Sequence, residues 1–455
     1  MKLFAEKILL ADGWQHNKTL VIENGVINQV IDGKALDAQV AKGPVIPGMI
    51  NCHSHAFQRA FAGFSEQGSE GKDSFWTWRN VMYKFLAQLS AENAETIATQ
   101  LYIEMVKSGY TRVAEFHYLH HDVSGQPYQE LATMARAIFN AAKTTNIGLT
   151  MLPVMYQFSG FGAQAPNEGQ QRFINSTEQF NQLVSDCFAL TKDYSNTNVG
   201  IAPHSLRAVD KQGIEQAVAH VRSLDANAPI HIHIAEQQKE VNDCLAHYGK
   251  RPVQWLLDNC QLDKNWCLIH ATHIDDSELH GMVAQQAIAG ICPTTEANLG
   301  DGIFPTDDFL QAGGVMAIGS DSHISVNPIE ELRWLEYAQR LAKQQRALLA
   351  TSETPSVGLN LWQQANKGGA LSTNSNSGEL AVGKQADLVV LDQNDLALYA
   401  HDEQHLLDSA IFATQRSPVR DVMVNGQWVV ENRIHRYEQQ SQQAFAELLA
   451  NLSEN

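Results

Sequence analysis

The stretch PGMINCHSHAFQRAFAG, residues 47–63, places His53 and His55 one residue apart at the end of an apolar run. Side chains at positions i and i+2 of a strand point to the same face of a sheet. A strand ending here would present two imidazoles side by side, and such a pair can bind a metal ion. Taken alone, an H-x-H pair is more often structural than metal-binding, so the interpretation depends on further ligands.

Further residues of the ligand type follow other apolar runs of the chain. His233 lies near the end of PIHIHIAE, His270 lies in WCLIHATH, and Asp321 lies in GVMAIGSDSH. Each could by itself be an ordinary core or surface residue, but several of them at one end of a barrel are hard to obtain by accident. Neutral imidazoles and a carboxylate suit a divalent metal of borderline softness. We therefore expect one divalent metal ion per chain, with zinc as the first choice.

Glu236 follows His233 by three residues and comes just after the same apolar run. A carboxylate at this place could turn toward the metal without binding it, take a proton from an attacking water and pass it to a leaving nitrogen. The alternative is a surface glutamate that opens the next helix, where the positive end of the helix dipole would favour it. The neighbouring histidines favour the catalytic interpretation.

The middle of the chain alternates short apolar runs with helical stretches. Eight such runs occur between PVIPGMINCHSH and GVMAIGSDSH, and the intervening segments 91–107 and 211–224 have helical periodicity. Parallel strands buried on both faces read as nearly continuous apolar runs. The pattern predicts an α/β fold with a (β/α)8 TIM-type barrel over residues 49–374. The ligand-type residues then lie at the C-terminal ends of the strands, where barrel enzymes carry their chemistry.

The two ends of the chain resemble each other and differ from the middle. TLVIENGVINQVI is centred on Asn24-Gly25, VRDVMVNGQWVVENRI is centred on Asn425-Gly426, and Asn-Gly between β-rich runs is a strong hairpin signal. We predict that residues 1–48 and 375–455 together form a small β domain, followed by a C-terminal helix.

Composition excludes several classes of function. The 455 residues are 44% hydrophobic and 18% charged, as in soluble globular proteins, and a formal net charge of −18 argues against nucleic-acid or anionic-membrane partners. The six cysteines form no C-x-x-C pair, which indicates buried thiols in a reducing compartment. Glu6, Lys7 and Asp12 interrupt the N-terminus too early for a signal peptide, and no apolar run approaches the about 20 residues of a membrane span. We expect a cytoplasmic protein, and the oligomeric state stays open, with a homodimer as one option.

Several motifs together resemble the amidohydrolase superfamily over nearly the whole chain: PGMINCHSHAFQR, HIHIAE, LIHATH, GSDSH and SGELAVGKQADLVVLD. This resemblance implies a barrel joined to a small β-sandwich made from both termini. The run GIAPHSL has no lysine at its end, where binuclear members carry a bridging carboxylated lysine, so the chain resembles the mononuclear deaminase branch. Carried over from that branch, the metal ligands are His53, His55, His233 and Asp321. The catalytic residues are Glu236, His270 and Asp321, with His270 contacting the attacking water.

More specific stretches resemble the formimidoylglutamate deiminases within that superfamily: HSHAFQRAFAG, FWTWRNVMY, EFHYLHHD, APHSLRAV and CPTTEANLGDGIFP. Enzymes of this family convert N-formimino-L-glutamate and water to N-formyl-L-glutamate and ammonia in histidine breakdown. By this resemblance the substrate-binding residues are Gln58, Arg79, Tyr118, His204 and Arg207. The planar fork of arginine binds carboxylates in a bidentate manner, which suits a small dicarboxylate substrate. The alternative for either arginine is an ordinary salt bridge on a loop.

Two other functions stay open. Another deaminase or ring hydrolase of the same fold, such as a guanine deaminase, a chlorotriazine hydrolase or an imidazolonepropionase, would require stacking aromatic residues and fewer arginines. A non-catalytic binding protein that kept the barrel is the more remote alternative. The joint presence of four predicted ligands and Glu236 disfavours it.

Overall fold

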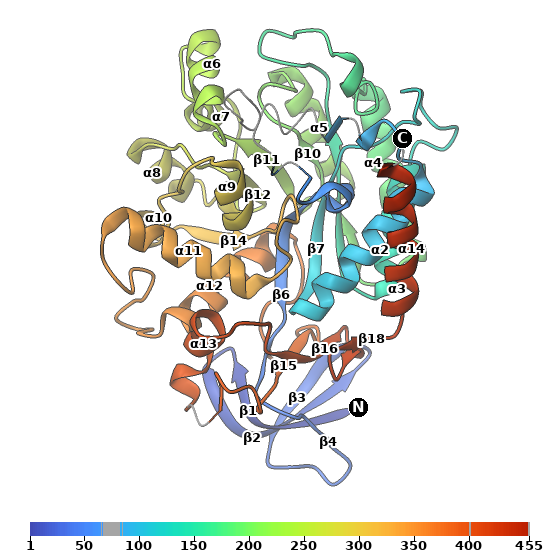
Figure 1. The fold of residues 1–455 in the computed structure, drawn as a ribbon. Helices are drawn as coiled ribbons and strands as arrows, with labels where there is room; N and C mark the ends of the chain where they lie inside the picture. The colour runs from blue at the N-terminus through green and yellow to red at the C-terminus, as the bar shows by residue number, and fades with distance from the viewer. Residues whose placement is uncertain (65, 67–81, 84, 400–401, 454–455) are drawn as a thin grey trace.

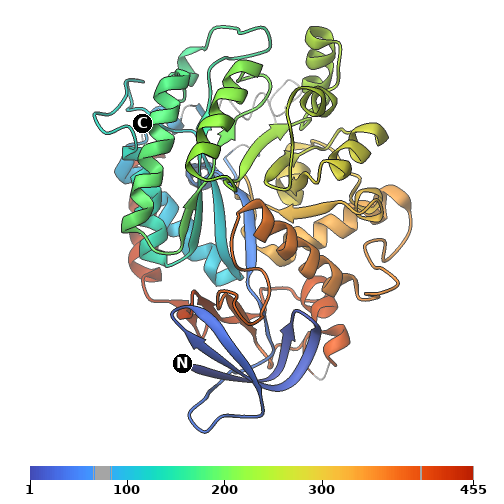
Figure 2. The same cartoon turned by 180° about the vertical axis from the view of Figure 1, so that it is seen from behind.

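The computed structural model describes residues 1–64, 66, 82–83, 85–399 and 402–453 of the chain. Its centre is a barrel of parallel strands surrounded by helices, and a second sheet lies against one end of that barrel (Figures 1 and 2). The barrel strands are β6 Met49–Ser54, β7 Tyr110–His117, β8 Gly148–Met155, β9 Thr197–Val199, β10 Ala202–Pro203, β11 Ile230–Ile234, β12 Trp266–His270, β13 Ile288–Ile291 and β14 Val315–Ile318. These strands confirm the predicted barrel.

The fourth strand of the barrel is divided into β9 and β10 around Gly200. Both parts pair with β8, but a Cβ atom on Gly200 would lie 2.3 Å from the carbonyl oxygen of Pro229. Only glycine allows the backbone to approach this closely. Just beyond it, Ile201 N donates to Pro229 O at 3.0 Å and His231 N donates to Ile201 O at 3.0 Å. These bonds join β10 to β11 and close the barrel.

Helices cover the outside of the barrel. They are α2 Ala91–Ser108, α3 Thr133–Thr145, α4 Thr177–Leu190, α5 Lys211–Leu224, α6 Gln238–Tyr248, α7 Pro252–Asn259, α8 Asp276–Ala284, α9 Pro293–Leu299, α10 Thr306–Gln311, α11 Pro328–Lys343 and α12 Val357–Ser372, with short 3₁₀ turns at η1 Ala56–Phe61, η2 Glu168–Gln170 and η3 Thr191–Asp193. The helices predicted over 91–107 and 211–224 are confirmed as α2 and α5. A capping box between Ser90 and Asn93 starts α2, and Gly109 ends it with a φ of 108°.

Strands from both ends of the chain form one continuous sheet with its own apolar core. Its strands are β1 Lys2–Leu10, β2 Gly13–Glu23, β3 Val26–Asp32, β4 Gln39–Val40, β5 Val45–Pro47, β15 Leu388–Leu391, β16 Val419–Val424, β17 Gln427–Glu431 and β18 Ile434–His435. The antiparallel pairing of β5 with β15 joins the two ends. Both predicted hairpins are confirmed, because Asn24-Gly25 and Asn425-Gly426 have the positive φ angles of a type I′ turn.

The C-terminal part of the chain adds two further helices: α13 Glu403–Phe412 lies between β15 and β16, and α14 Glu438–Ser453 comes last. The last helix packs against α2 of the barrel, where Lys107 and Glu438 form an ion pair (Figure 1). The division of the chain into 1–48 with 375–455 and 49–374 stays a prediction.

A buried polar cluster joins the N-terminal end of the barrel to the terminal sheet. The two terminal nitrogens of Arg112 on β7 donate to groups of Thr150, Asn196 and Asn198. Nearby, Asn425 N donates to Oδ1 of Asp387 at 2.6 Å. Burial raises the pKa of Asp387 to about 6, against the effects of the Asn425 hydrogen bond and of Arg112. One residue, Gly48, separates the end of β5 in this sheet from the start of β6 in the barrel. The barrel strands therefore begin at this sheet, and their C-terminal ends point away from it (Figure 1).

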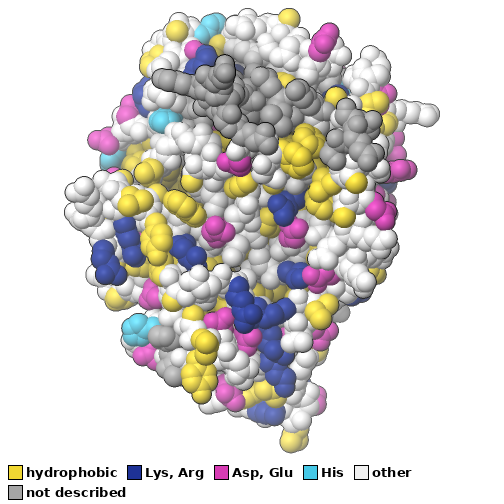
Figure 3. Space-filling view, in the orientation of Figure 1, with side chains coloured by type: hydrophobic (Ala, Val, Ile, Leu, Met, Phe, Trp, Pro, Cys, Tyr) yellow, Lys and Arg dark blue, Asp and Glu magenta, His cyan; other side chains and the backbone are white. Residues whose placement is uncertain are grey.

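The surface shown in Figure 3 carries lysine and arginine side chains interspersed with acidic and hydrophobic ones. Within the described part of the chain, no helix combines the length and the apolar character needed to cross a membrane.

Candidate active site

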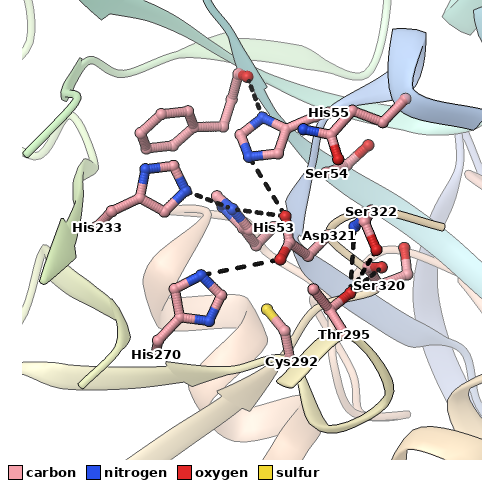
Figure 4. A network of polar contacts seen from close by, with 12 residues as sticks. His53, Ser54, His55, His233, His270, Cys292, Thr295, Ser320, Asp321 and Ser322 are labelled. Atoms are coloured by element: carbon pink, nitrogen blue, oxygen red, sulfur yellow. Dashed lines mark hydrogen bonds and ion pairs between the residues drawn. The ribbon is translucent and has the colours of Figure 1, made fainter. Parts of the chain in front are cut away.

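Four predicted ligands converge at the C-terminal end of the barrel (Figure 4). His53 lies on β6, His55 directly follows that strand, His233 lies on β11 and Asp321 follows β14. The Nε2 atoms of His53 and His233 are 3.0 Å apart. Oδ1 of Asp321 lies 3.5 Å from Nε2 of His53 and 3.3 Å from Nε2 of His55. Three ring nitrogens and one carboxylate oxygen therefore face a common point.

The backbone fixes which nitrogens face that point. Nδ1 of His55 lies 2.8 Å from the carbonyl oxygen of Phe116, and Nδ1 of His233 lies 3.2 Å from that of His204. A carbonyl only accepts, so each Nδ1 carries the proton and each Nε2 keeps its lone pair. Second partners of this kind orient histidines that bind metals.

The protonation states of these residues fit a cation. Burial lowers the pKa of His53 to about 3 and also lowers the pKa values of His55 and His233, so all three rings are neutral. Burial alone would raise the pKa of Asp321, but His53, His270 and His55 lower it below its usual range. Three neutral nitrogens and one carboxylate are a donor set for a divalent metal. A cation between these atoms would offset the repulsion between their lone pairs.

The backbone around the site is strained. Positive φ angles occur at Ala235, at His270 and at Asp321, with values of 50°, 67° and 46°. Residues other than glycine rarely adopt such angles, and they concentrate at functional sites. Two backbone hydrogen bonds hold Asp321 to the C-terminal end of β6, from Asp321 N to His53 O at 3.0 Å and from His55 N to Asp321 O at 3.3 Å.

Glu236 and His270 lie beside the ligand group. Nε2 of His270 is 3.8 Å from Oε1 of Glu236 and 3.8 Å from Oδ2 of Asp321. Burial raises the pKa of Glu236 to about 7, and Asp321 adds to the effect, while His270 and Arg207 oppose it. Burial disfavours the charge on His270, but the carboxylates of Glu236, Glu296 and Asp321 raise its pKa to about 10. A carboxyl group that titrates near neutrality can both accept and return a proton.

Four of the five predicted substrate-binding residues line one cavity together with these groups: Gln58, Tyr118, His204 and Arg207. Nε2 of Gln58 donates to the hydroxyl of Tyr118 at 3.2 Å. Burial opposes the charge of Arg207, but Glu240 and neighbouring groups raise its pKa, so the guanidinium stays positive. Arg79 lies outside the described residues.

A sequence profile of the amidohydrolase family matches residues 45–429. The chain belongs to the amidohydrolase family. It is 48% identical over 452 residues to the formimidoylglutamate deiminase of Pseudomonas aeruginosa, with 99% of each chain covered. It is 26% identical over 431 residues to a 5-methylthioadenosine/S-adenosylhomocysteine deaminase of Shouchella clausii, covering 90% of this chain and 88% of that one.

Among solved structures, an amidohydrolase from Brucella melitensis matches this chain with a TM-score of 0.94 and 44% identity, covering 99% of both chains. The predicted superfamily and the fold are thereby confirmed. As an amidohydrolase, the protein is an enzyme of the class that hydrolyses C–N bonds, and the alternative of a non-catalytic barrel is wrong.

The amidohydrolase site also contains residues that the sequence did not point to. Tyr156, Phe173, Met82 and Leu299 line the cavity, and Glu296 contacts His270. Tyr156 directly follows β8 and could have been found by the same strand-end pattern as the histidines. Phe173 and Met82 lie outside the barrel strands, where no local pattern identifies them.

Proposed function

We propose that this amidohydrolase hydrolyses N-formimino-L-glutamate to N-formyl-L-glutamate and ammonia, as a step of histidine degradation. The observation that carries the proposal is one cavity, which is lined by three of the proposed ligands, by Glu236 and by a positively charged arginine, Arg207. Metal hydrolysis alone does not need that arginine. The near full-length similarity to the deiminase of Pseudomonas aeruginosa supports the same substrate.

His53, His55, His233 and Asp321 would hold the metal ion, and we propose zinc because imidazoles and a carboxylate are its usual ligands at catalytic sites. When bound, the ion supplies Lewis acidity that makes water a nucleophile near neutral pH.

The residues of the chain would then move the protons. Glu236 takes a proton from the attacking water, whose oxygen adds to the formimino carbon. Glu236 returns the proton to the imino-derived nitrogen, which becomes an amino group. Glu236 then takes the hydroxyl proton of this adduct and passes it to the same nitrogen, so the carbonyl of the formyl group forms, the bond from carbon to that nitrogen breaks and ammonia leaves. His270 and Asp321 orient the water, since Nε2 of His270 lies 3.8 Å from both carboxylates.

Recognition of the substrate would rest on its two carboxylates. The protein carries a formal charge of −18, so a dianion needs a local positive anchor against that field. Arg207 provides one in the cavity, and we propose Arg79 as a second. Gln58, Tyr118 and His204 would complete the contacts to the substrate.

One observation favours a ring substrate instead. Tyr118, Tyr156 and Phe173 all line the cavity, with ring centroids of Tyr118 and Phe173 4.9 Å apart, and aromatic walls of this kind can stack on a purine. Ammonia release should therefore be measured with N-formimino-L-glutamate, N-formimino-L-aspartate and guanine. The proposal requires the glutamate derivative to give the highest kcat/KM, and faster turnover of guanine would establish the ring alternative.

A further inference from the structure

His270 has two ring nitrogens with different surroundings. Its Nε2 faces Glu236 and Asp321, where the attacking water would sit. Its Nδ1 lies on the opposite side, 3.2 Å from Oε1 of Glu296. The residue ends β12 with a φ of 67°, and Ala271 follows with a φ of 47°, so the chain turns sharply to place the ring between these groups.

Glu296 is itself fixed. It lies on α9, is 4% exposed, and its Oε1 accepts a hydrogen bond from Cys292 N at 2.8 Å. The backbone of the same residue is held at both ends, because Glu296 N donates to Cys292 O at 2.9 Å and Asp301 N donates to Glu296 O at 2.9 Å. The carboxylate therefore has little freedom to leave His270.

We propose that Glu296 is a positioning residue, which holds the proton of His270 on Nδ1 and so keeps Nε2 directed at the reacting water. A carboxylate oxygen only accepts hydrogen bonds, so Nδ1 must carry the proton in the neutral as well as in the charged ring. The role in turnover rests on the proposed function, but the place of the proton does not.

The physical need for such a residue follows from the chemistry of imidazole. A neutral ring without a fixed partner exchanges its proton between the two nitrogens, and the ring can also rotate about its Cβ–Cγ bond. In the charged ring both nitrogens carry hydrogen, and the bond from Nδ1 to Glu296 then fixes which nitrogen faces the water. A buried carboxylate behind a catalytic histidine fixes the tautomer in the same way in serine proteases.

A second buried carboxylate, which contacts the same helix α9 from outside it, offers a matched control. Glu331 on α11 is fully buried and accepts hydrogen bonds from N and Oγ1 of Thr294, in the first turn of α9, at 2.9 and 2.6 Å. Like Glu296 it is a buried carboxylate that holds this helix. No contact between Glu331 and His270 occurs among the described residues.

The first experiment places the proton directly. Metal-loaded protein with ¹⁵N-labelled histidine should show a His270 signal with hydrogen on Nδ1, identified by its loss in His270→Gln. The signal should persist in Glu331→Gln and change in Glu296→Ala. A wild-type ring without hydrogen on Nδ1 overturns the proposal, whether or not any variant folds.

The second experiment measures turnover of N-formimino-L-glutamate. Glu296→Ala should lower kcat by about 10–100-fold, the usual range for a residue that orients a histidine at a metal site, with KM and metal content nearly unchanged. Glu296→Gln keeps an acceptor and should lose less, and formate should restore part of the activity of Glu296→Ala. Equal losses in Glu331→Gln, or loss of metal from Glu296→Ala, contradict the positioning role. If the wild type is inactive on this substrate but the Nδ1 signal behaves as expected, only the proposed function fails.

Discussion

The two ends of the barrel both bury charged side chains, but they use them differently. At the N-terminal end, Arg112 and Asp387 are held by backbone and asparagine groups of the barrel and the terminal sheet. At the C-terminal end, His55 and His233 each form a hydrogen bond from Nδ1 to a backbone carbonyl oxygen and direct Nε2 at a shared point. Positive φ angles also occur at the C-terminal ends of the strands, at His270 and Asp321.

This difference distinguishes buried polar side chains with a structural role, at the N-terminal end of the barrel, from those with a proposed catalytic role, at the C-terminal end. At the N-terminal end, the hydrogen bonds that Arg112 and Asp387 form go to other groups of the chain. The histidines instead direct ring nitrogens at one another and at Asp321, an arrangement that a bound cation would stabilise. A local departure from the usual rules of packing is typical of a functional site. Substitutions at the two ends should therefore have separate effects, on metal and turnover at one end and on stability at the other.

The largest effect is expected for His233→Ala. Loss of one of the proposed ligands should remove both the bound metal and the activity, because the ion loses one of its three proposed nitrogen ligands and is held more weakly. Elemental analysis together with ammonia release tests this, with one divalent ion per chain expected in the wild type. Two ions per chain, or an active preparation without metal, would contradict the mononuclear site.

The next effect concerns the proton carrier. Glu236→Gln keeps the shape of the side chain but cannot accept a proton, so turnover should fall by on the order of 10²–10⁴-fold. Metal content should stay at the wild-type level, which distinguishes this variant from His233→Ala. Near-normal turnover would contradict the role in proton transfer and leave Glu236 as a buried residue that precedes α6.

A smaller effect is expected for Arg207→Met. A charge-assisted contact to a carboxylate contributes about 1.5–3 kcal/mol, so kcat/KM should fall at least ~10-fold without loss of metal. The loss should shrink for an analogue that lacks one carboxylate, because the arginine then has no partner to lose. If both substrates keep the wild-type ratio of kcat/KM, Arg207 is structural.

The smallest effect on turnover, and a clear one on stability, is expected at the other end of the barrel. The pKa of Asp387 is raised to about 6 from 3.8, so the unfolded state ionises first as the pH rises. The free energy of unfolding should therefore decrease by up to roughly 3 kcal/mol as the pH rises from about 4 to about 6. Above that range this decrease should stay constant.

Asp387→Asn removes this titration and keeps an acceptor for Asn425 N. The difference in unfolding free energy between the variant and the wild type should therefore grow in favour of the variant as the pH rises from 4 to 6.5, while kcat changes little. A difference that does not depend on pH would show that Asp387 does not titrate in this range.

Much of this arrangement was accessible from the sequence because it depends on local patterns. Apolar runs ending in histidine or aspartate marked β6, β11, β12 and β14, helical periodicity marked α2 and α5, and Asn-Gly marked both hairpins. Packing of α14 on α2 and the break at Gly200 were not accessible, because both depend on contacts between distant segments.

The same limit applies to the site. His270 and Glu296 are 26 positions apart, and no spacing rule connects the end of a strand to the interior of the helix after the next strand. The motif CPTTEANLGDGIFP supported the resemblance, but only the folded chain shows which of its side chains reaches the histidine. The roles of the substrate-binding residues stay predictions until the variants are measured.

The pairing of β5 with β15 has a consequence for synthesis. Pro47 lies opposite Leu388, 341 positions later in the chain (388 − 47), so the ribosome must make most of the protein before this pair can form. At about 5–20 residues per second the wait is roughly 17–70 s. During that time the free edge of the N-terminal strands can pair with other nascent chains. Chaperones that cover this edge should therefore matter most while the ribosome is still translating the barrel.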